Sequence, residues 1–468
     1  MDLITEGKME KLVKLFIVIL FVSIFLVILH QVAGHKIIAS MYYGKSFAFL
    51  NDLIKGQNFY PLKHYLQFSD QLLVYGLLCV NLFVILLCFS VGRHFIFLFF
   101  IAIVFLEIGL RILEPCFPKS YINDPVLGVR YRPFQEGANS LGFNDKEYPK
   151  EKNNLTTRII ALGDSFNWAG GYEMNYWTLA EQILNNSNRG KSIEILNQGT
   201  PMIGPAYELR LLKAVSMNFE PDIVVLAFFV GNDFGESDMN NFRIERFGYP
   251  LDIRLNERRR FPYVDLRDSY LWFFIDHRWE DFANTYNLSK EKRDGLRTGS
   301  FSKRNFLQIE AGRIAICTSP FYQSMAWLET RERILDFKNY LSQKGALFLI
   351  LILPDEYQVN KSLRQEIFKE FSELKAAQYD FELPQKQLGR FLTDHNIEYL
   401  DLLPAFKSQA KDHELYLFRD THFNNFGNSL ASKEVAQFLK SRIQHLNEQK
   451  MGQLQQSPVA AKWGIKFL

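Results

Sequence analysis

The amino-terminal quarter of the chain contains three long runs of apolar residues. Residues 15–33 form a 19-residue run whose only ionisable member is His30, and residues 72–91 and 95–113 form two more. A run of about 20 apolar residues is long enough for a helix to cross the hydrocarbon core of a bilayer. The pattern therefore predicts three transmembrane helices in a membrane anchor at residues 1–114. A cleaved signal peptide is the alternative for the first run, although its apolar core is longer than is typical.

Positive charges around these runs indicate an orientation. Three lysines precede the first run, Arg93 lies in the short join between the second and third runs, and the lysines of the loop 34–71 are spread more thinly. Positive charge concentrated close to membrane spans is typical of the cytoplasmic side. The pattern favours a cytoplasmic amino terminus, which places the residues after 114 outside the cell (inner) membrane.

Short apolar runs alternate with amphipathic stretches in the rest of the chain. The runs are 158–162, 192–196, 222–230, 346–354 and 397–403, and the helical stretches between and after them are about 177–186, 206–217, 327–341 and 427–442. Continuous apolar runs of this length are typical of buried parallel strands. Their alternation with helices predicts a three-layer α/β/α, doubly wound parallel sheet of the flavodoxin-like kind over residues 158–446.

Three segments fall outside that alternation. Residues 115–157 are rich in Pro, Gly, Asn and charge and are interpreted as a lead-in with a short exposed linker at 150–154. Residues 234–319 are too long for a plain connection and are interpreted as an insertion over or beside the active site. The triple arginine 258–260 within it either binds an acidic substrate or forms a solvated surface. Residues 447–468 are interpreted as a tail.

Composition excludes several classes of function. The net charge is only +3, and no basic stripe with interleaved aromatic residues is present, so a nucleic-acid partner is not expected. The four cysteines show no metal-binding or disulfide spacing. Neither a metal nor a cofactor is expected.

A serine follows the first of the predicted strands. Residues 158–162 lead directly into Gly163-Asp164-Ser165-Phe166, in which the glycine is expected to permit a tight turn. A serine in such a turn faces the crevice where α/β proteins bind their ligands. Most serines in this position merely cap helices, so the remaining groups of a site must come from elsewhere in the chain.

Asp420 and His422 are the candidate partners of this serine. Among the histidines after the apolar runs, only His422 has an acidic residue two positions before it and a turn and helix after it. In extended backbone, residues i and i+2 project to the same side, so Asp420 is expected to orient the imidazole toward Ser165. Asn232, in Gly-Asn-Asp, ends the strand predicted at 222–230 and lies at the same edge of the sheet.

These blocks together resemble the SGNH (GDSL-type) hydrolase superfamily over roughly residues 155–446. The resemblance implies that Ser165 is the nucleophile, His422 the general base and Asp420 its orienting acid. It further implies an oxyanion hole formed by the N–H of Ser165 and the side-chain amide of Asn232. The lead-in stretch DPVLGVRYRP at 124–133 looks like that of membrane-anchored bacterial members.

Two departures from the family pattern affect the expected site. Met202 stands where the family's second block has a glycine whose N–H serves the oxyanion hole, and methionine resists the positive φ that glycine accepts. The donor is therefore expected to be Met202 on another path of the loop, Gly204, or absent. The short Asp-x-His spacing is similar to that of proteins that O-acetylate exopolysaccharides such as alginate, although their block order differs.

The resemblance implies chemistry on acyl esters. The first hypothesis is a membrane-anchored serine esterase that hydrolyses O-acyl esters, with acetyl favoured, of an extracytoplasmic glycan or lipid through an acyl-enzyme. The second is an O-acyltransferase that acylates an envelope polysaccharide and receives its acyl group from a membrane acyltransferase partner. The third is a non-catalytic membrane scaffold. Asp164 and Asp233 are interpreted as turn carboxylates rather than as metal ligands.

Overall fold

The computed structural model describes most of the chain from residue 90 onward. The described residues are 90–116, 120–149, 151–153, 155–187, 192–234, 242–246, 249–252 and 269–455. The chain divides into two compact units, the first made of Met1–Cys116 and Tyr263–Asp276 and the second of Phe117–Pro262 and His277–Leu468. Each unit is described by itself below.

The first unit contains helix α5 (Ser90–Leu113), which includes the predicted membrane span 95–113. In the part of the chain that the structure describes, no helix is both long enough and apolar enough to cross a membrane. The predicted span 15–33 lies outside the described residues, as does 72–91 except for its last two positions.

Glu107 of α5 binds backbone groups of Tyr270 and Leu271, which belong to the same unit. Its carboxylate accepts hydrogen bonds from the backbone N–H groups of Tyr270 (3.0 Å) and Leu271 (2.8 Å), which open helix α11 (Tyr270–Arg293). The same carboxylate pairs with Arg111, one turn further along α5, at 2.7 Å. Glu107 therefore serves as a side-chain cap for N–H groups that have no partner within α11.

The second unit is built on a five-stranded parallel sheet. Its strands are β3 (Thr156–Gly163), β4 (Ser192–Gly199), β5 (Ile223–Phe229), β8 (Leu347–Leu353) and β9 (Glu398–Asp401). They lie in the order β4-β3-β5-β8-β9, and every neighbouring pair is parallel. The order reverses between β3 and β5, which makes this the switch point of a doubly wound sheet, where such folds bind ligands. The predicted α/β fold and its five strands are confirmed.

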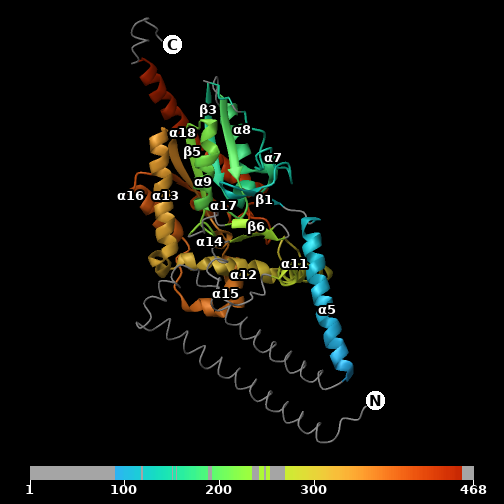
Figure 1. The fold of residues 1–468 in the computed structure, drawn as a ribbon. Coiled ribbons are helices and arrows are strands. Elements are labelled where there is room, and N and C mark those ends of the chain that lie inside the picture. Colours follow the sequence, from blue (N-terminus) through green and yellow to red (C-terminus); the bar gives the residue numbers. More distant parts are fainter. Residues whose placement is uncertain are drawn as a thin grey trace, which may run out of the picture. The chain divides into compact units, whose positions relative to one another are not determined.

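Helices cover both faces of the sheet (Figure 1). On one face, α8 (Tyr176–Ser187) and α18 (Asn425–Gln455) pack against each other and over a core that includes Leu349 and Leu351 of β8. On the other face, Phe337 of α13 (Met325–Lys344) stacks on Phe348 of β8, with ring centroids 5.6 Å apart. Phe348 and Leu349 project to opposite sides because successive residues of a strand alternate. α9 (Pro205–Ala214) contacts α13 and β3, and α16 (Leu383–Asp394) contacts β9.

The remaining elements are short or belong to the predicted insertion. They are β1 (Tyr121–Asp124), β2 (Gly128–Tyr131), α6 (Ser165–Trp168), α7 (Gly171–Met174), β6 (Phe242–Arg246), β7 (Tyr249–Asp252), α12 (Lys303–Arg313), α14 (Glu356–Val359), α15 (Lys361–Glu370) and α17 (Leu403–Gln409). The triple arginine 258–260 lies outside the described residues. α18 continues to Gln455, so the first part of the predicted tail is helical.

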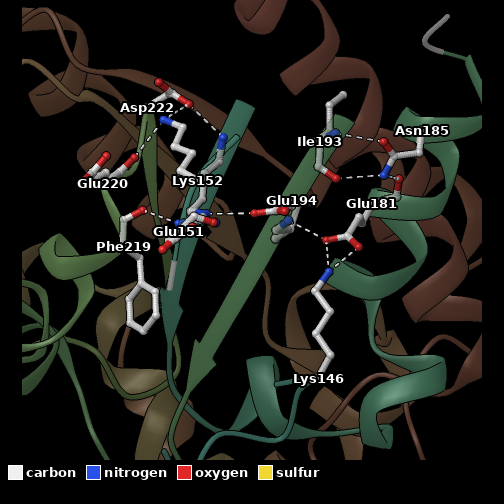
Figure 2. Close-up of polar contacts among 12 residues, drawn as sticks. Lys146, Glu151, Lys152, Glu181, Asn185, Ile193, Glu194, Phe219, Glu220 and Asp222 are labelled. Carbon is white, nitrogen blue, oxygen red and sulfur yellow. Dashed lines mark hydrogen bonds and ion pairs between the residues drawn. The ribbon is translucent and has the colours of Figure 1, made fainter. Parts of the chain in front are cut away.

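Two lysines attach the lead-in to the sheet domain (Figure 2). Lys146 pairs with Glu181 of α8, and Lys152 pairs with Asp222, just before β5, at 2.6 Å. Lys152 belongs to the predicted linker 150–154, yet its side chain is only 15% exposed. The expectation of an exposed linker is wrong at this residue, because the carboxylate of Asp222 is buried and a buried charge is stabilised by an opposite one.

Arg158 joins three segments at the start of β3. Its side chain is fully buried and donates to Glu194 of β4 (2.9 Å) and to the backbone carbonyls of Phe219 (2.8 Å) and Glu151 (3.1 Å). Figure 2 shows these three partners around the strand. A fully buried guanidinium persists only when its donors are satisfied in this way, so Arg158 holds the lead-in and two neighbouring strands together.

Replacing Arg158 by leucine is predicted to destabilise the sheet domain strongly. Arg158→Leu leaves the Glu194 carboxylate and two carbonyl groups without their partner, which costs about 2–4 kcal/mol in free energy of unfolding. Urea unfolding followed by circular dichroism measures this loss. The matched control is Arg390→Leu, because Arg390 and its partner Asp394 are 81% and 63% exposed, and this variant should stay within about 0.5 kcal/mol of wild type. Equal losses in the two variants would contradict the assignment.

Candidate active site

Ser165 is the first residue of α6, directly after β3. Asp164 caps this short helix by accepting a hydrogen bond from the N–H of Phe166 at 2.8 Å. Gly163 does not adopt a positive φ; a Cβ there would lie 2.6 Å from the side chain of the buried Asn167, and a Cβ on Gly199 would also overlap Asn167. The expectation that Gly163 permits a turn is therefore wrong. Glycine is needed there because Asn167 fits between the ends of two strands.

Asp420 and His422 lie in a tight loop rather than in extended backbone. Residues Tyr416 and Phe423 form an antiparallel bridge that closes this loop. Within it, Arg419 has a φ of 50° and Thr421 a φ of 76°. The left-handed region is disfavoured for a β-branched residue such as threonine. The predicted extended backbone is thus wrong, and it is the left-handed turn that brings the carboxylate and imidazole of Asp420 and His422 together.

The structure brings Ser165, His422 and Asp420 into one hydrogen-bonded series. The Nε2 atom of His422 lies 2.9 Å from Oγ of Ser165, and its Nδ1 atom lies 2.7 Å from Oδ1 of Asp420. The His422 side chain is 23% exposed, so the base is supported by protein and still open to solvent. This is the geometry of a nucleophile, a base and a group that orients the base.

Hydrogen bonds outweigh burial at the Asp420 carboxylate. Burial raises the pKa of Asp420, but hydrogen bonds from His422 and Ser300 lower it by more than burial raises it. The pKa therefore lies below the usual value for aspartate. Asp420 is therefore ionised at neutral pH. An ionised carboxylate on Nδ1 keeps the proton of a neutral imidazole on that nitrogen and leaves Nε2 able to accept the serine proton.

Asn232 reaches the same place from the end of β5. Its side-chain amide donates to Oδ2 of Asp164 at 3.0 Å, while its Oδ1 atom is buried without a hydrogen-bond partner. Rotating the amide would place its oxygen against the Asp164 carboxylate, so this contact holds the nitrogen toward Asp164, the residue before Ser165. Burial raises the pKa of Asp164, against the opposing hydrogen bonds from Phe166 and Asn232.

Met202 adopts the backbone conformation expected of the glycine it replaces. Its φ is 61°, whereas Gly204 is extended, with a φ of −149°, and precedes α9. Methionine therefore takes a φ that its Cβ disfavours, and the expectation that the loop follows another path is wrong at this residue. Met202 is 65% exposed, so the rest of its side chain has room. The loop is held beside the serine turn, because the N–H of Thr200 donates to the carbonyl of Gly163 at 3.1 Å.

Sequence reasoning missed three residues of this site. Asn167 lies beneath the serine turn, and the ring of Phe166 packs against the imidazole of His422, with centroids 5.2 Å apart. Ser300, in the predicted insertion, donates a hydrogen bond from Oγ to Oδ2 of Asp420. Nothing in the local sequence distinguishes Ser300 from other surface serines, since its role depends on a residue 120 positions away.

The carboxylates near Ser165 have partners within the protein. Asp233 is buried and accepts a hydrogen bond from the N–H of Phe229 at 2.7 Å, as a turn carboxylate does. Among the described residues, no group of three or more His, Cys, Asp or Glu side chains is placed to hold a metal ion.

Comparison with known proteins identifies the class of this domain. The family model of the SGNH hydrolase-like domain of acetyltransferase AlgX matches residues 322–464, a range that contains Asp420 and His422 but not Ser165. No curated protein matches the chain in sequence. The chain carries an SGNH hydrolase-like domain, so the resemblance to the SGNH superfamily is confirmed. It is an SGNH-type enzyme that acts on ester bonds, as a hydrolase or as an acyltransferase.

Several solved structures share a distant likeness with the chain. The psychrotrophic esterase EstA from Pseudoalteromonas sp. is 13% identical over 62% of this chain and 99% of its own, with a TM-score of 0.28. The lipase/acylhydrolase from Enterococcus faecalis is 12% identical over 61% and 96%, with a TM-score of 0.30. The acetyl xylan esterase AlAXEase is 14% identical over 59% and 97%, with a TM-score of 0.29. At these TM-scores the likenesses carry no argument about this chain.

The contact between Asn232 and Asp164 predicts a pH-dependent variant. Asn232→Asp places a second carboxylate about 3 Å from Asp164, and two such groups share one proton because they cannot both ionise. The pKa of the pair is then raised in the folded state, and stability is lost as pH rises through it. The deficit in melting temperature relative to wild type should therefore widen from about pH 5 to pH 8. Asn232→Ala is the control: it removes one hydrogen bond from Asp164 without adding a charge, so its deficit should widen less with pH than that of Asn232→Asp. Equal pH dependence in the two variants would rule out the contact.

Proposed function

We propose that this protein is a membrane-anchored serine esterase that removes O-acyl groups, with acetyl favoured, from an extracytoplasmic glycan or lipid. The observation that carries the proposal is the position of His422, with one ring nitrogen 2.9 Å from the Ser165 hydroxyl and the other 2.7 Å from Asp420. A serine hydroxyl is a weak nucleophile by itself and becomes effective when a base removes its proton during attack.

The proposed reaction passes through an acyl-enzyme. Oγ of Ser165 attacks the ester carbonyl carbon while Nε2 of His422 takes the hydroxyl proton. The tetrahedral intermediate then collapses, the C–O bond to the alcohol breaks, and His422 returns the proton to that oxygen. Water attacks the acyl-serine with the same base, which releases the carboxylic acid and restores the hydroxyl. Asp420 stays ionised and stabilises the imidazolium in both steps.

Three hydrogen-bond donors are proposed to stabilise the negatively charged oxygen of the tetrahedral intermediate. The N–H groups of Ser165 and Met202 are proposed as backbone donors, supported by the φ of 61° at Met202 and by the bond from Thr200 to Gly163 beside the serine turn. The side-chain amide of Asn232 is the third, because a primary amide has two N–H bonds and only one is needed for Asp164. Preorganised donors of this kind each contribute about 10²–10³ in rate.

The location and substrate class of the proposal rest on the sequence. The apolar runs 15–33, 72–91 and 95–113, with three lysines before the first run and Arg93 between the second and third, support an anchor of three spans that leaves the enzyme domain outside the membrane. The matched family is described as that of an acetyltransferase, which supports acetyl as the acyl group.

Labelling with a fluorophosphonate probe tests the proposal directly. Such a probe phosphonylates only an activated serine, so the full-length protein in mild detergent should be labelled, and Ser165→Ala and His422→Ala should not. Ester hydrolysis should fall at least about 10³-fold in both variants. The control is His395→Ala, since the imidazole of His395 bonds to the carbonyl of Phe391, one turn earlier in the same helix end, and this variant should label normally. A folded wild-type protein that fails to react would favour a binding or scaffolding role.

The O-acyltransferase is retained as a second candidate because the matched family is that of acetyltransferase AlgX. The two activities share every step up to the acyl-enzyme and differ in whether water or a sugar hydroxyl attacks it. With p-nitrophenyl acetate as donor and an oligosaccharide as acceptor, an esterase should release free acetate at a rate that is independent of the acceptor. Acetyl transfer to the sugar, with release of p-nitrophenol accelerated by the acceptor, would instead establish the transferase.

A further inference from the structure

A short segment of the insertion lies along the loop that carries the acid and the base. We name residues 297–301 the strap. At its first residue, Arg297 forms two hydrogen bonds of 3.0 Å with the carboxylate of Glu414, and its guanidinium lies 4.3 Å from the centroid of the Phe418 ring. Both Arg297 and Glu414 are exposed, so this pair contributes little energy by itself. It marks where the strap meets the loop.

The backbone of the strap is held more closely at its next residues. A Cβ on Gly299 would overlap the carbonyl oxygen of Phe418, so only glycine permits this approach. Two residues later, the N–H of Phe301 donates to the carbonyl of Arg419 at 3.0 Å. Ser300 lies between these two contacts and is thereby fixed beside Asp420.

We infer that Ser300 is a positioning residue of the active site and that the insertion completes the catalytic machinery. Oγ of Ser300 donates to Oδ2 of Asp420, while Oδ1 of the same carboxylate accepts from His422. With both oxygens bound, the carboxylate cannot rotate about its Cβ–Cγ bond, and the imidazole keeps its direction toward Ser165. The inference rests on the proposed function, because it assigns a role within that reaction.

A second contact fixes the same loop from the end of α11. Nη1 of Arg419 lies 2.6 Å from Oε2 of Glu291, and the two side chains are about 15% exposed. The other oxygen of Glu291 accepts from the N–H of Lys303 at 3.0 Å, just beyond the strap. Arg419 and Thr421 both have positive φ values, a conformation that persists only when neighbouring groups hold it. The insertion supplies these groups at Arg419, the residue before Asp420: the Glu291 carboxylate binds its side chain, and the Phe301 N–H binds its carbonyl.

The charge state of Asp420 agrees with this role. Hydrogen bonds to the ionised form lower the pKa of a carboxyl group, and the pKa of Asp420 lies below its usual value although burial acts in the opposite direction. A serine hydroxyl adds a donor without adding charge, so it fixes the orientation of the carboxylate while leaving its negative charge to the imidazole.

Ser302 offers a matched control two residues beyond Ser300. Its side chain is fully buried, and its hydroxyl has no hydrogen-bond partner. The substitutions Ser300→Ala and Ser302→Ala therefore remove the same group from neighbouring positions, but only the first removes a bond to Asp420. A purely structural role for this segment would affect both variants alike.

The test compares these two variants with wild type in the full-length protein, using p-nitrophenyl acetate. Ser300→Ala should lower kcat about tenfold, as expected for one lost hydrogen bond to a charged group, with KM within about twofold. Ser302→Ala should keep both constants within about twofold. Ser300→Thr, which retains the hydroxyl, should restore most of kcat. If Ser300→Ala folds poorly, Ser300→Cys preserves the volume with a much weaker donor and should show the same loss of kcat.

Equal kcat values in Ser300→Ala, Ser302→Ala and wild type would overturn the inference, as would a loss in Ser300→Ala that Ser300→Thr fails to restore. Fluorophosphonate labelling separates this failure from that of the proposed function. Wild type that is labelled and active beside an unaffected Ser300→Ala removes only the role of Ser300. Folded wild type that is neither labelled nor active removes the reaction and, with it, the inference.

Discussion

The hydrogen bond between His422 and Ser165 is the interaction on which the rest of the site depends. It joins residues 257 positions apart, at a distance of 2.9 Å. The parallel sheet supplies one end of this bond, because β3 delivers Ser165 to its carboxyl edge at the switch point beside β5. The closed loop between Tyr416 and Phe423 supplies the other. Most of the polar contacts around the site fix one of these two ends.

Part of the backbone strain in the described residues lies around this bond. Met202, Arg419 and Thr421 all adopt positive φ values without being glycine, and such residues cost about 1–3 kcal/mol each. The contacts that hold them come from different segments: the Thr200 N–H on Gly163, the Glu291 carboxylate on Arg419, and the strap on Phe418. A site of this kind is preorganised, because the energy that maintains the geometry comes from folding and not from the substrate.

The sequence predicts those parts of the molecule that depend on local pattern. The five strands follow from their apolar runs, and Ser165, Asp420, His422 and Asn232 follow from their places at strand and loop ends. The expectations that failed concern packing and pairing in three dimensions, which the pattern of residue types does not encode. The space needed at Gly163 depends on Asn167, the burial of Lys152 depends on Asp222, and the loop of Asp420 is shaped by a bridge. The bond from Ser300 to Asp420 joins an insertion to a terminal loop, and no spacing rule connects the two.

The central claim is that Ser165 carries the acyl group during the reaction. The most direct measurement is to mix the full-length protein with p-nitrophenyl acetate, quench with acid within the first turnovers, and map the acetylated peptides by mass spectrometry. The account predicts an acetyl group on the peptide that contains Ser165, appearing at the rate of p-nitrophenol release and decaying with turnover. Acetyl groups found only on other residues, while ester hydrolysis proceeds normally, would contradict it.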